Sequence, residues 1–182
     1  MQTVADLEQA CANTERLVRG VGSEEWSLPT PCADWDVRAL VNHSAWVLNM
    51  MGVVTRGDAI PARDLDVLGS DPERAYAEAA ARAITGWKER GTAGTVTIPF
   101  ATIPADTALS IAVVDTFVHG WDIARATNQD PRLDPGLGAA LLEWVPAILP
   151  PARENRAFGP IVTVSEDAPA PERLLALLGR CP

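Results

Sequence analysis

The chain has 182 residues, 47% of them hydrophobic, and a formal net charge of −9 at pH 7. This length and apolar content suffice for one continuous core without disulfide support, so we expect a single domain over residues 1–182. The acidic charge repels phosphate backbones, and no basic stripe with interleaved aromatic residues offsets it, which argues against nucleic-acid binding.

The N-terminal segment begins no apolar run and carries three carboxylates in its first fifteen residues, which is not the pattern of a secretory signal peptide. No stretch approaches eighteen consecutive apolar residues, so we expect no membrane span. The cysteines, Cys11, Cys32 and Cys181, stand at wide and unpatterned spacing, which suits a reducing compartment. We therefore expect a cytoplasmic protein.

Apolar side chains recur at helical spacing over residues 4–21, with charged residues between them. Gly20 and Gly22 interrupt this pattern, so the first predicted helix ends there. The next segment contains Pro29 and Pro31, which disfavour a regular helix and predict an extended loop. This loop leads to the start of a second helix.

The second predicted helix is capped by Asp34 or Asp36 and ends at Gly52 or Gly57. Its side chains are apolar on most sides, so we expect it in the middle of the structure. A third, alanine-rich helix is predicted over residues 71–91, with an aspartate as its N-cap and a proline at its first position.

The remaining predicted elements are a short β-branched strand, two helices, a second β-branched run and a short terminal helix. They cover residues 95–98, 106–126, 135–148, 161–164 and 171–178. The sequence therefore predicts a mainly α fold: a four-helix bundle over about residues 1–150, with one or two short β-strands at its edge, and a small C-terminal α/β extension over about residues 151–182.

The only two histidines of the chain fall in predicted helices, His43 in the second and His119 in the fourth. Residues four apart share a helix face, so Asp115 and His119 can point to one place, and Asp122 lies on the same face. Packing of the two helices would add His43. Imidazole and carboxylate groups bind zinc, and three protein ligands leave a position open; the same donors suit nickel, iron or manganese.

A second interpretation needs no metal. A lone histidine on an apolar helix is usually a hydrogen-bonded core residue, and Asp115 would satisfy it. Against this interpretation, a buried carboxylate needs a compensating cation. A bound metal ion would compensate the charge of Asp115. Arg125 could then pair with Asp122, three residues earlier on the helix.

Other residues near the proposed ligands also need a role. Trp46 and Trp121 lie about one turn from them and are predicted to line a pocket. Cys32 lies about eleven residues before His43, roughly 16 Å if measured along a helix, which argues against shared ligation of one ion. We interpret Cys32 as a packed loop residue, with a reactive thiol as the alternative.

Two motifs and the C-terminal end carry a family resemblance. The stretches "PTPCADWDVRALVNH" (residues 29–43), "DTFVHGWDIARATNQ" (residues 115–129) and "RLLALLGRCP" resemble the actinobacterial mycothiol-dependent maleylpyruvate isomerase-like proteins of the DinB/YfiT-like superfamily. The resemblance implies a DinB-like bundle that holds a divalent metal, usually zinc, on His43, Asp115 and His119. The isomerase has a glutamate at the position of Asp115 and a longer C-terminal region.

The resemblance further implies thiol chemistry. Mycothiol would bind the open metal position as a thiolate and add to a small electrophilic substrate, in an isomerase or an S-transferase reaction. Asp122 would orient a ligand histidine, and Arg125 is a second candidate catalytic residue. Two alternatives stay open: a non-catalytic metal- or ligand-binding bundle, and a metal hydrolase with Asp122 as its base. We expect a monomer or a homodimer.

Overall fold

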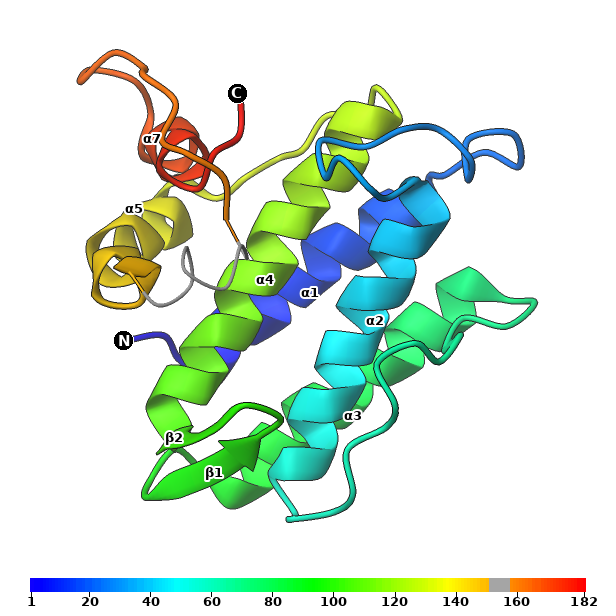
Figure 1. Ribbon diagram of the computed structural model, residues 1–182, viewed down its shortest axis with the longest axis vertical. Helices are drawn as coiled ribbons and strands as arrows, with labels where there is room; N and C mark the ends of the chain where they lie inside the picture. Colours follow the sequence, from blue (N-terminus) through cyan, green and yellow to red (C-terminus); the bar gives the residue numbers. More distant parts are fainter. Residues whose placement is uncertain (151–157) are drawn as a thin grey trace. The chain divides into compact units, whose positions relative to one another are not determined.

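The computed structural model describes residues 1–150 and 158–182 (Figure 1). They divide into two compact units, one formed by residues 2–131 and the other by residues 132–182 together with Met1. The predicted start of the C-terminal extension, near residue 151, lies outside the described residues.

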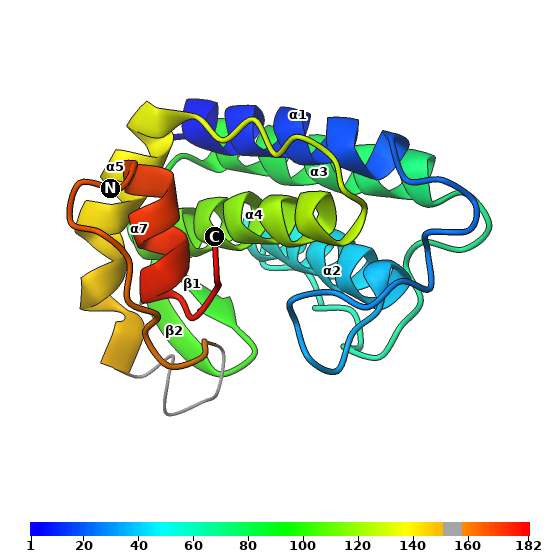
Figure 2. The same cartoon turned by 90° about the horizontal axis from the view of Figure 1, so that it is seen from above.

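The larger unit is a four-helix bundle. Its helices are α1 (Val4–Arg19), α2 (Val37–Val54), α3 (Pro72–Arg90) and α4 (Ala105–Ala126). Helix α2 packs against α3 and α4, and α1 packs against the same two helices, so each helix has two neighbours (Figures 1 and 2). The predicted mainly α fold with a four-helix bundle is confirmed.

Side-chain caps explain where three of these helices begin. Thr3 and Asp6 form a reciprocal capping box at the start of α1. The side chain of Asp36 accepts a hydrogen bond from the Ala39 amide, so Asp36 rather than Asp34 caps α2. Asp71 caps α3 in the same way. These caps fix where each helix starts and therefore which side chains face the core.

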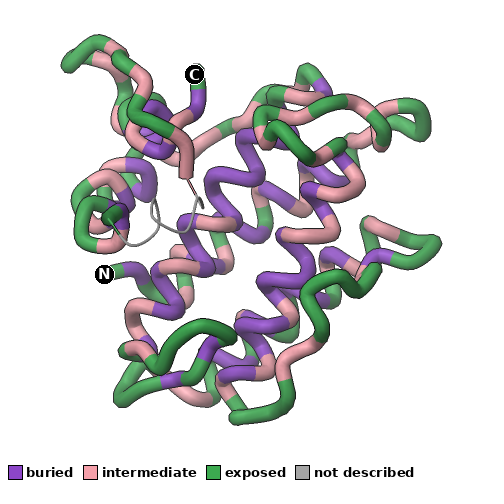
Figure 3. The backbone as a smooth tube through the Cα atoms, viewed as in Figure 1, coloured by how far each residue is buried: buried purple, intermediate pink, exposed green. Residues whose placement is uncertain are grey.

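Helix α4 is the most enclosed element of the bundle. Of its 22 residues, 16 are buried, and they include the polar side chains of His119 and Asp122. Buried positions run along the bundle helices, whereas the loops that join them are mostly exposed (Figure 3). Polar groups inside such a helix must find partners within the protein.

A β-hairpin connects α3 to α4. Strands β1 (Thr95–Ile98) and β2 (Ala101–Pro104) pair antiparallel, with Thr95 opposite Pro104. The sequence predicted β1 but not β2, which forms because the chain reverses within two residues.

In the smaller unit the predicted strand over residues 161–164 is wrong. This run pairs with no strand in the part of the chain that the structure describes, and the Val162 amide donates instead to the Ala176 carbonyl of helix α7 (Ala170–Leu177). A β-branched run becomes a strand only when a partner strand lies beside it.

The other elements of the smaller unit are helical: α5 (Pro135–Trp144), the 3-10 turn η1 (Val145–Ala147) and α7 (Ala170–Leu177). Helix α5 ends four residues before the predicted end. The reason is Pro146, which has no amide hydrogen to continue the helical hydrogen bonds. Among the described helices, none is both long and apolar enough to cross a bilayer.

Candidate metal centre

The three predicted ligands meet between α2 and α4. Asp115 Oδ1 lies 3.4 Å from His43 Nε2 and 3.5 Å from His119 Nε2, and the two imidazole centroids are 5.2 Å apart. One donor atom from each of the three residues lies within 4.8 Å of the other two. The side chains are 17%, 17% and 11% exposed for His43, Asp115 and His119, so the group is shielded but reachable from solvent.

This geometry suits a tetrahedral divalent ion. Two ligand atoms bound to zinc at about 2.0–2.1 Å with tetrahedral angles lie about 3.3–3.4 Å apart. The two separations from Asp115 Oδ1 are close to this value and longer than a good hydrogen bond. The donor set of two imidazoles and one carboxylate is one that zinc uses in catalytic sites. The residues present therefore fit the ion that the sequence motifs imply.

Asp122 orients His119. It is fully buried, and its Oδ2 lies 2.9 Å from His119 Nδ1, three residues earlier on α4. Because a carboxylate accepts, the imidazole donates from Nδ1 and directs Nε2 toward Asp115 and His43. Metal-binding histidines usually have such a partner on the second ring nitrogen.

The charges around His119 favour its protonated form in the absence of an ion. Burial by itself lowers the His119 pKa, but the carboxylate of Asp115, followed by hydrogen bonds to Asp122 and Cys32, raises it to about 10. An ion that binds Nε2 must therefore displace a proton, so metal binding at this site has to be coupled to pH.

A folded-back loop covers the two histidines. The loop is closed by a bridge between Pro29 and Asp36, and Trp35 at its end places its ring 4.5 Å from the His43 ring and 6.1 Å from the His119 ring. Trp35 was not among the site residues predicted from the sequence. The signal that pointed to it was its position directly before the N-cap of the helix that carries His43.

Cys32 lies in the same loop, and its Sγ is 3.4 Å from Asp122 Oδ2. Together with His119 and Asp122 it forms a second group of metal-type donors within 4.8 Å. The helical distance from His43 does not apply to it, because residues before Asp36 are not helical and the loop turns back toward α4.

The other predicted site residues lie outside this group. The Trp46 indole donates to the carbonyls of Pro61 and Ala62, which ties the following loop to α2. Trp121 is buried on α4. Arg125 is exposed, and within residues 1–150 and 158–182 no ion pair joins it to Asp122. Their predicted roles as pocket-lining and catalytic residues stay predictions.

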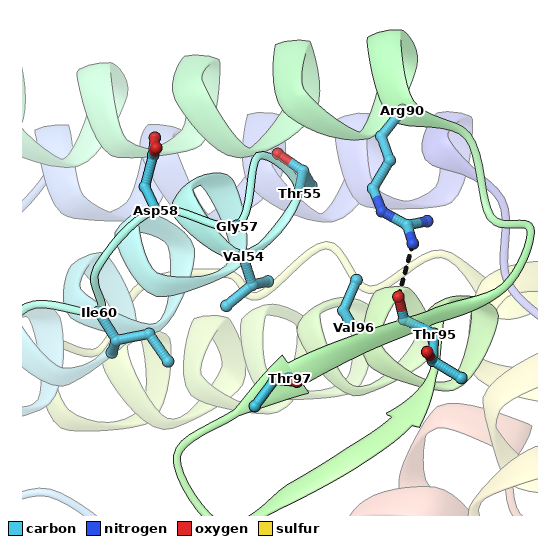
Figure 4. A pocket seen from close by; sticks show the side chains of 9 residues that line it. All are labelled: Val54, Thr55, Gly57, Asp58, Ile60, Arg90, Thr95, Val96 and Thr97. Atoms are coloured by element: carbon cyan, nitrogen blue, oxygen red, sulfur yellow. Dashed lines mark hydrogen bonds between the residues drawn. The ribbon is translucent and has the colours of Figure 1, made fainter.

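A hollow of about 540 Å³ lies at the far end of α2, lined in part by Val54, Thr55 and Arg90 (Figure 4). Its polar groups are already engaged: the Arg90 guanidinium donates to the Thr95 carbonyl at 2.7 Å, and the Thr55 hydroxyl donates to the Gly52 carbonyl. Val54 is about eleven residues from His43, roughly 16 Å along the helix. This hollow therefore offers no convergent polar groups and is separate from the metal-type cluster.

The chain resembles proteins of known sequence and structure. Two Mycobacterium tuberculosis proteins, MT0763 and Rv0738, both named as uncharacterized, are each 27% identical to it over 167 residues, which is 90% of either chain.

The crystal structures of the mycothiol-dependent maleylpyruvate isomerase and of a mutant of it match with a TM-score of 0.60 and 16% identity. The match covers 76% of this chain and 65% of the isomerase chain, and it shows a shared fold. The family model described as "Mycothiol maleylpyruvate isomerase N-terminal domain" matches residues 7–124, which is more than half of the chain and includes both histidines. The chain therefore belongs to the mycothiol maleylpyruvate isomerase N-terminal domain family, as its two motifs predicted.

Proposed function

We propose that this protein is a divalent-metal-dependent enzyme that presents mycothiol to a small electrophilic substrate, as an isomerase or an S-transferase. The observation that carries the proposal is the position of Asp115 Oδ1, 3.4 Å from His43 Nε2 and 3.5 Å from His119 Nε2. Membership of a family named for a mycothiol-dependent isomerase supports the choice of thiol.

Each residue has a defined task in this proposal. His43, Asp115 and His119 would hold the ion, with zinc as the expected metal and nickel as the alternative. When bound, such an ion stabilises the thiolate of a coordinated thiol and so supplies a nucleophile at neutral pH. Asp122 keeps the Nδ1 proton of His119, and the Trp35 ring shields one side of His43 from water.

Asp122 suits this orienting role better than the role of a general base. Its Oδ2 already accepts from His119 Nδ1 at 2.9 Å, and the residue is fully buried. A base in a hydrolase must reach the attacking water, which is a different position. The geometry therefore disfavours the metal hydrolase.

One observation favours a non-catalytic rival. With its pKa raised to about 10, a protonated His119 would neutralise part of the charge of Asp115 and Asp122 without any ion. The cluster would then be a buried network that joins α2 to α4, as in the second interpretation of the sequence. An experiment has to separate these two cases.

Calorimetric titration of the chelator-treated protein with zinc tests the site. We expect one zinc per chain, and we expect His43→Ala and His119→Ala each to abolish stoichiometric binding. Arg125→Ala is the matched control, because Arg125 is exposed on the same helix as His119. If both histidine variants keep full zinc by elemental analysis and remain folded by circular dichroism, the site assignment is wrong.

Titration of the zinc-loaded protein with thiols tests the function. We expect mycothiol to bind, and glutathione and bacillithiol to bind more weakly or not at all. Binding of none of the three would favour the non-catalytic rival.

A cytoplasmic location, a monomeric or homodimeric state, and a bundle with an extension from about residue 151 remain part of the proposal.

A further inference from the structure

One carboxylate oxygen of Asp122 contacts both Cys32 and His119, beside the direct side-chain interaction between the thiol and the imidazole. Asp122 Oδ2 accepts a hydrogen bond from the Cys32 thiol at 3.4 Å and from His119 Nδ1 at 2.9 Å. Asp122 has no exposed surface, so bulk water does not replace either donor. The position of this oxygen, and with it the orientation of the imidazole, therefore depends on both.

The loop holds the Cys32 thiol in place through its backbone. The Cys32 amide donates to Thr30 Oγ1 at 3.1 Å, and the Cys32 carbonyl accepts from the Trp35 amide at 2.9 Å. The Thr30 hydroxyl in turn donates to the Trp35 carbonyl at 2.8 Å. These hydrogen bonds of the turn thus fix the position of Cys32. Its thiol contacts Asp122 on α4, which lies 90 positions later in the sequence.

A direct metal ligand is the rival role for Cys32, since its sulfur, His119 and Asp122 also lie within 4.8 Å of one another. In that arrangement the ion would have to compete with Asp122 for His119 Nδ1. The same imidazole already directs Nε2 toward Asp115 and His43. The shorter, charge-assisted bond between His119 and Asp122 favours a supporting role for the thiol.

We propose that Cys32 is a positioning residue of the metal centre, which holds Asp122 so that His119 presents Nε2 to the ion. This inference rests on the proposed function, because it assigns the thiol to the support of a ligand. Outer partners of metal-binding histidines commonly change metal affinity by about 10- to 100-fold when they are removed. A thiol is a weak donor, so the lower end of this range is expected.

Competitive zinc titration of three variants tests the role. Cys32→Ala removes the donor and is expected to weaken zinc binding about tenfold. Cys32→Ser keeps a hydroxyl donor and is expected to stay within about twofold of the unchanged protein. Cys181→Ala, at the exposed cysteine near the C-terminus, is the control and should have no effect. Equal zinc affinity of Cys32→Ala and the unchanged protein would overturn the inference.

The absorption spectrum of the cobalt-loaded protein separates the two roles. Without added thiol, a positioning role predicts no thiolate-to-cobalt charge-transfer band, whereas a ligand role predicts a band that disappears in Cys32→Ala. Such a band would overturn the proposal. If the unchanged protein binds zinc through both histidines but Cys32→Ala binds it equally well, only this inference fails; if the unchanged protein binds no metal, the proposed function fails with it.

Discussion

At the scale of single residues, two aspartates on α4 have different environments and therefore suit different proposed tasks. Asp115 is 17% exposed, and its Oδ1 lies 3.4 Å from His43 Nε2 and 3.5 Å from His119 Nε2. Asp122 is fully buried, lies about two helical turns after Asp115 on the same helix, and is hydrogen-bonded to His119 Nδ1. The first is suited to ligation and the second to orientation.

The pH dependence of the metal-free protein should report the charge of Asp115. Its carboxylate is the largest influence that raises the His119 pKa, which reaches about 10 against an ordinary value of 6.5. A raised pKa means that this contribution to stability is complete below pH 6.5 and is lost as pH rises through about 10. We expect the free energy of unfolding to fall over this window, and Asp115→Asn to reduce the fall.

Chemical denaturation between pH 6 and 10 measures this effect, and nuclear magnetic resonance follows His119 directly. In Asp115→Asn the His119 signal should titrate at a lower pH than in the unchanged protein. Asp64→Asn is the control, since it removes the same charge from an exposed loop. An identical His119 titration in the unchanged protein and Asp115→Asn would contradict the assigned role of Asp115.

Three of the predicted site residues lie close together in the sequence on one helix, whereas the missed ones are brought to the site by a loop. Asp115, His119 and Asp122 share one helix face, and that relation follows from the helical repeat alone. Trp35 and Cys32 reach the site through a loop that doubles back, and the bond between Thr30 and Trp35 that sets it has no periodic signal in the sequence. The distance from His43 that was estimated from sequence spacing therefore placed Cys32 too far from the site.

At the scale of elements, the helices were predictable because caps and apolar periodicity agree. Helix α4 begins within one residue of its predicted start and ends where predicted. The strands were less predictable because a strand depends on its partner: β2 was missed, and residues 161–164 formed no strand in the part that the structure describes.

Close packing of α2 against α3 depends on glycines. A Cβ added at Gly86 would overlap Thr55 Oγ1 and lie 3.2 Å from the Gly52 carbonyl oxygen. Overpacking typically costs about 1–3 kcal/mol, whereas replacing glycine by alanine in a helix gains about 1 kcal/mol. We expect Gly86→Ala to lower the free energy of unfolding by about 1 kcal/mol in chemical denaturation, which is the middle of the overpacking cost less the helical gain.

A double-mutant cycle with Thr55→Ala checks the cause. If the overlap with Thr55 Oγ1 destabilises Gly86→Ala, the double variant should lose less than the sum of the two single variants. Strict additivity would show that Thr55 is not the cause of the loss. No loss in Gly86→Ala would show that the helices separate at little cost.

At the scale of the whole molecule, the site brings together segments that are far apart in the chain. His43 and Asp115 are separated by 72 positions and Cys32 and Asp122 by 90. Periodicity predicts that helices form but not which faces meet, so convergence could be inferred only from the scarcity of histidine and the family motifs. The packing of α2 on α4 supplies that convergence.

Because the proposed ligands come from two helices, an ion bound between them should stabilise the folded molecule. A ligand that binds only the folded state adds about 2.7 kcal/mol when its free concentration is 100 times its Kd. For a chain of this size, that gain corresponds to a rise in Tm of about 5–10 °C. We expect zinc to produce this rise in thermal unfolding and a chelator to reverse it.

The same measurement distinguishes a shared site from loose surface binding. Magnesium, which prefers oxygen ligands and octahedral geometry, should leave Tm nearly unchanged. His43→Ala and His119→Ala remove ligands from different helices, so each should abolish the response to zinc, because an ion held on one helix alone does not tie α2 to α4. A full zinc response in either variant would mean that the stabilising ion does not bridge these helices.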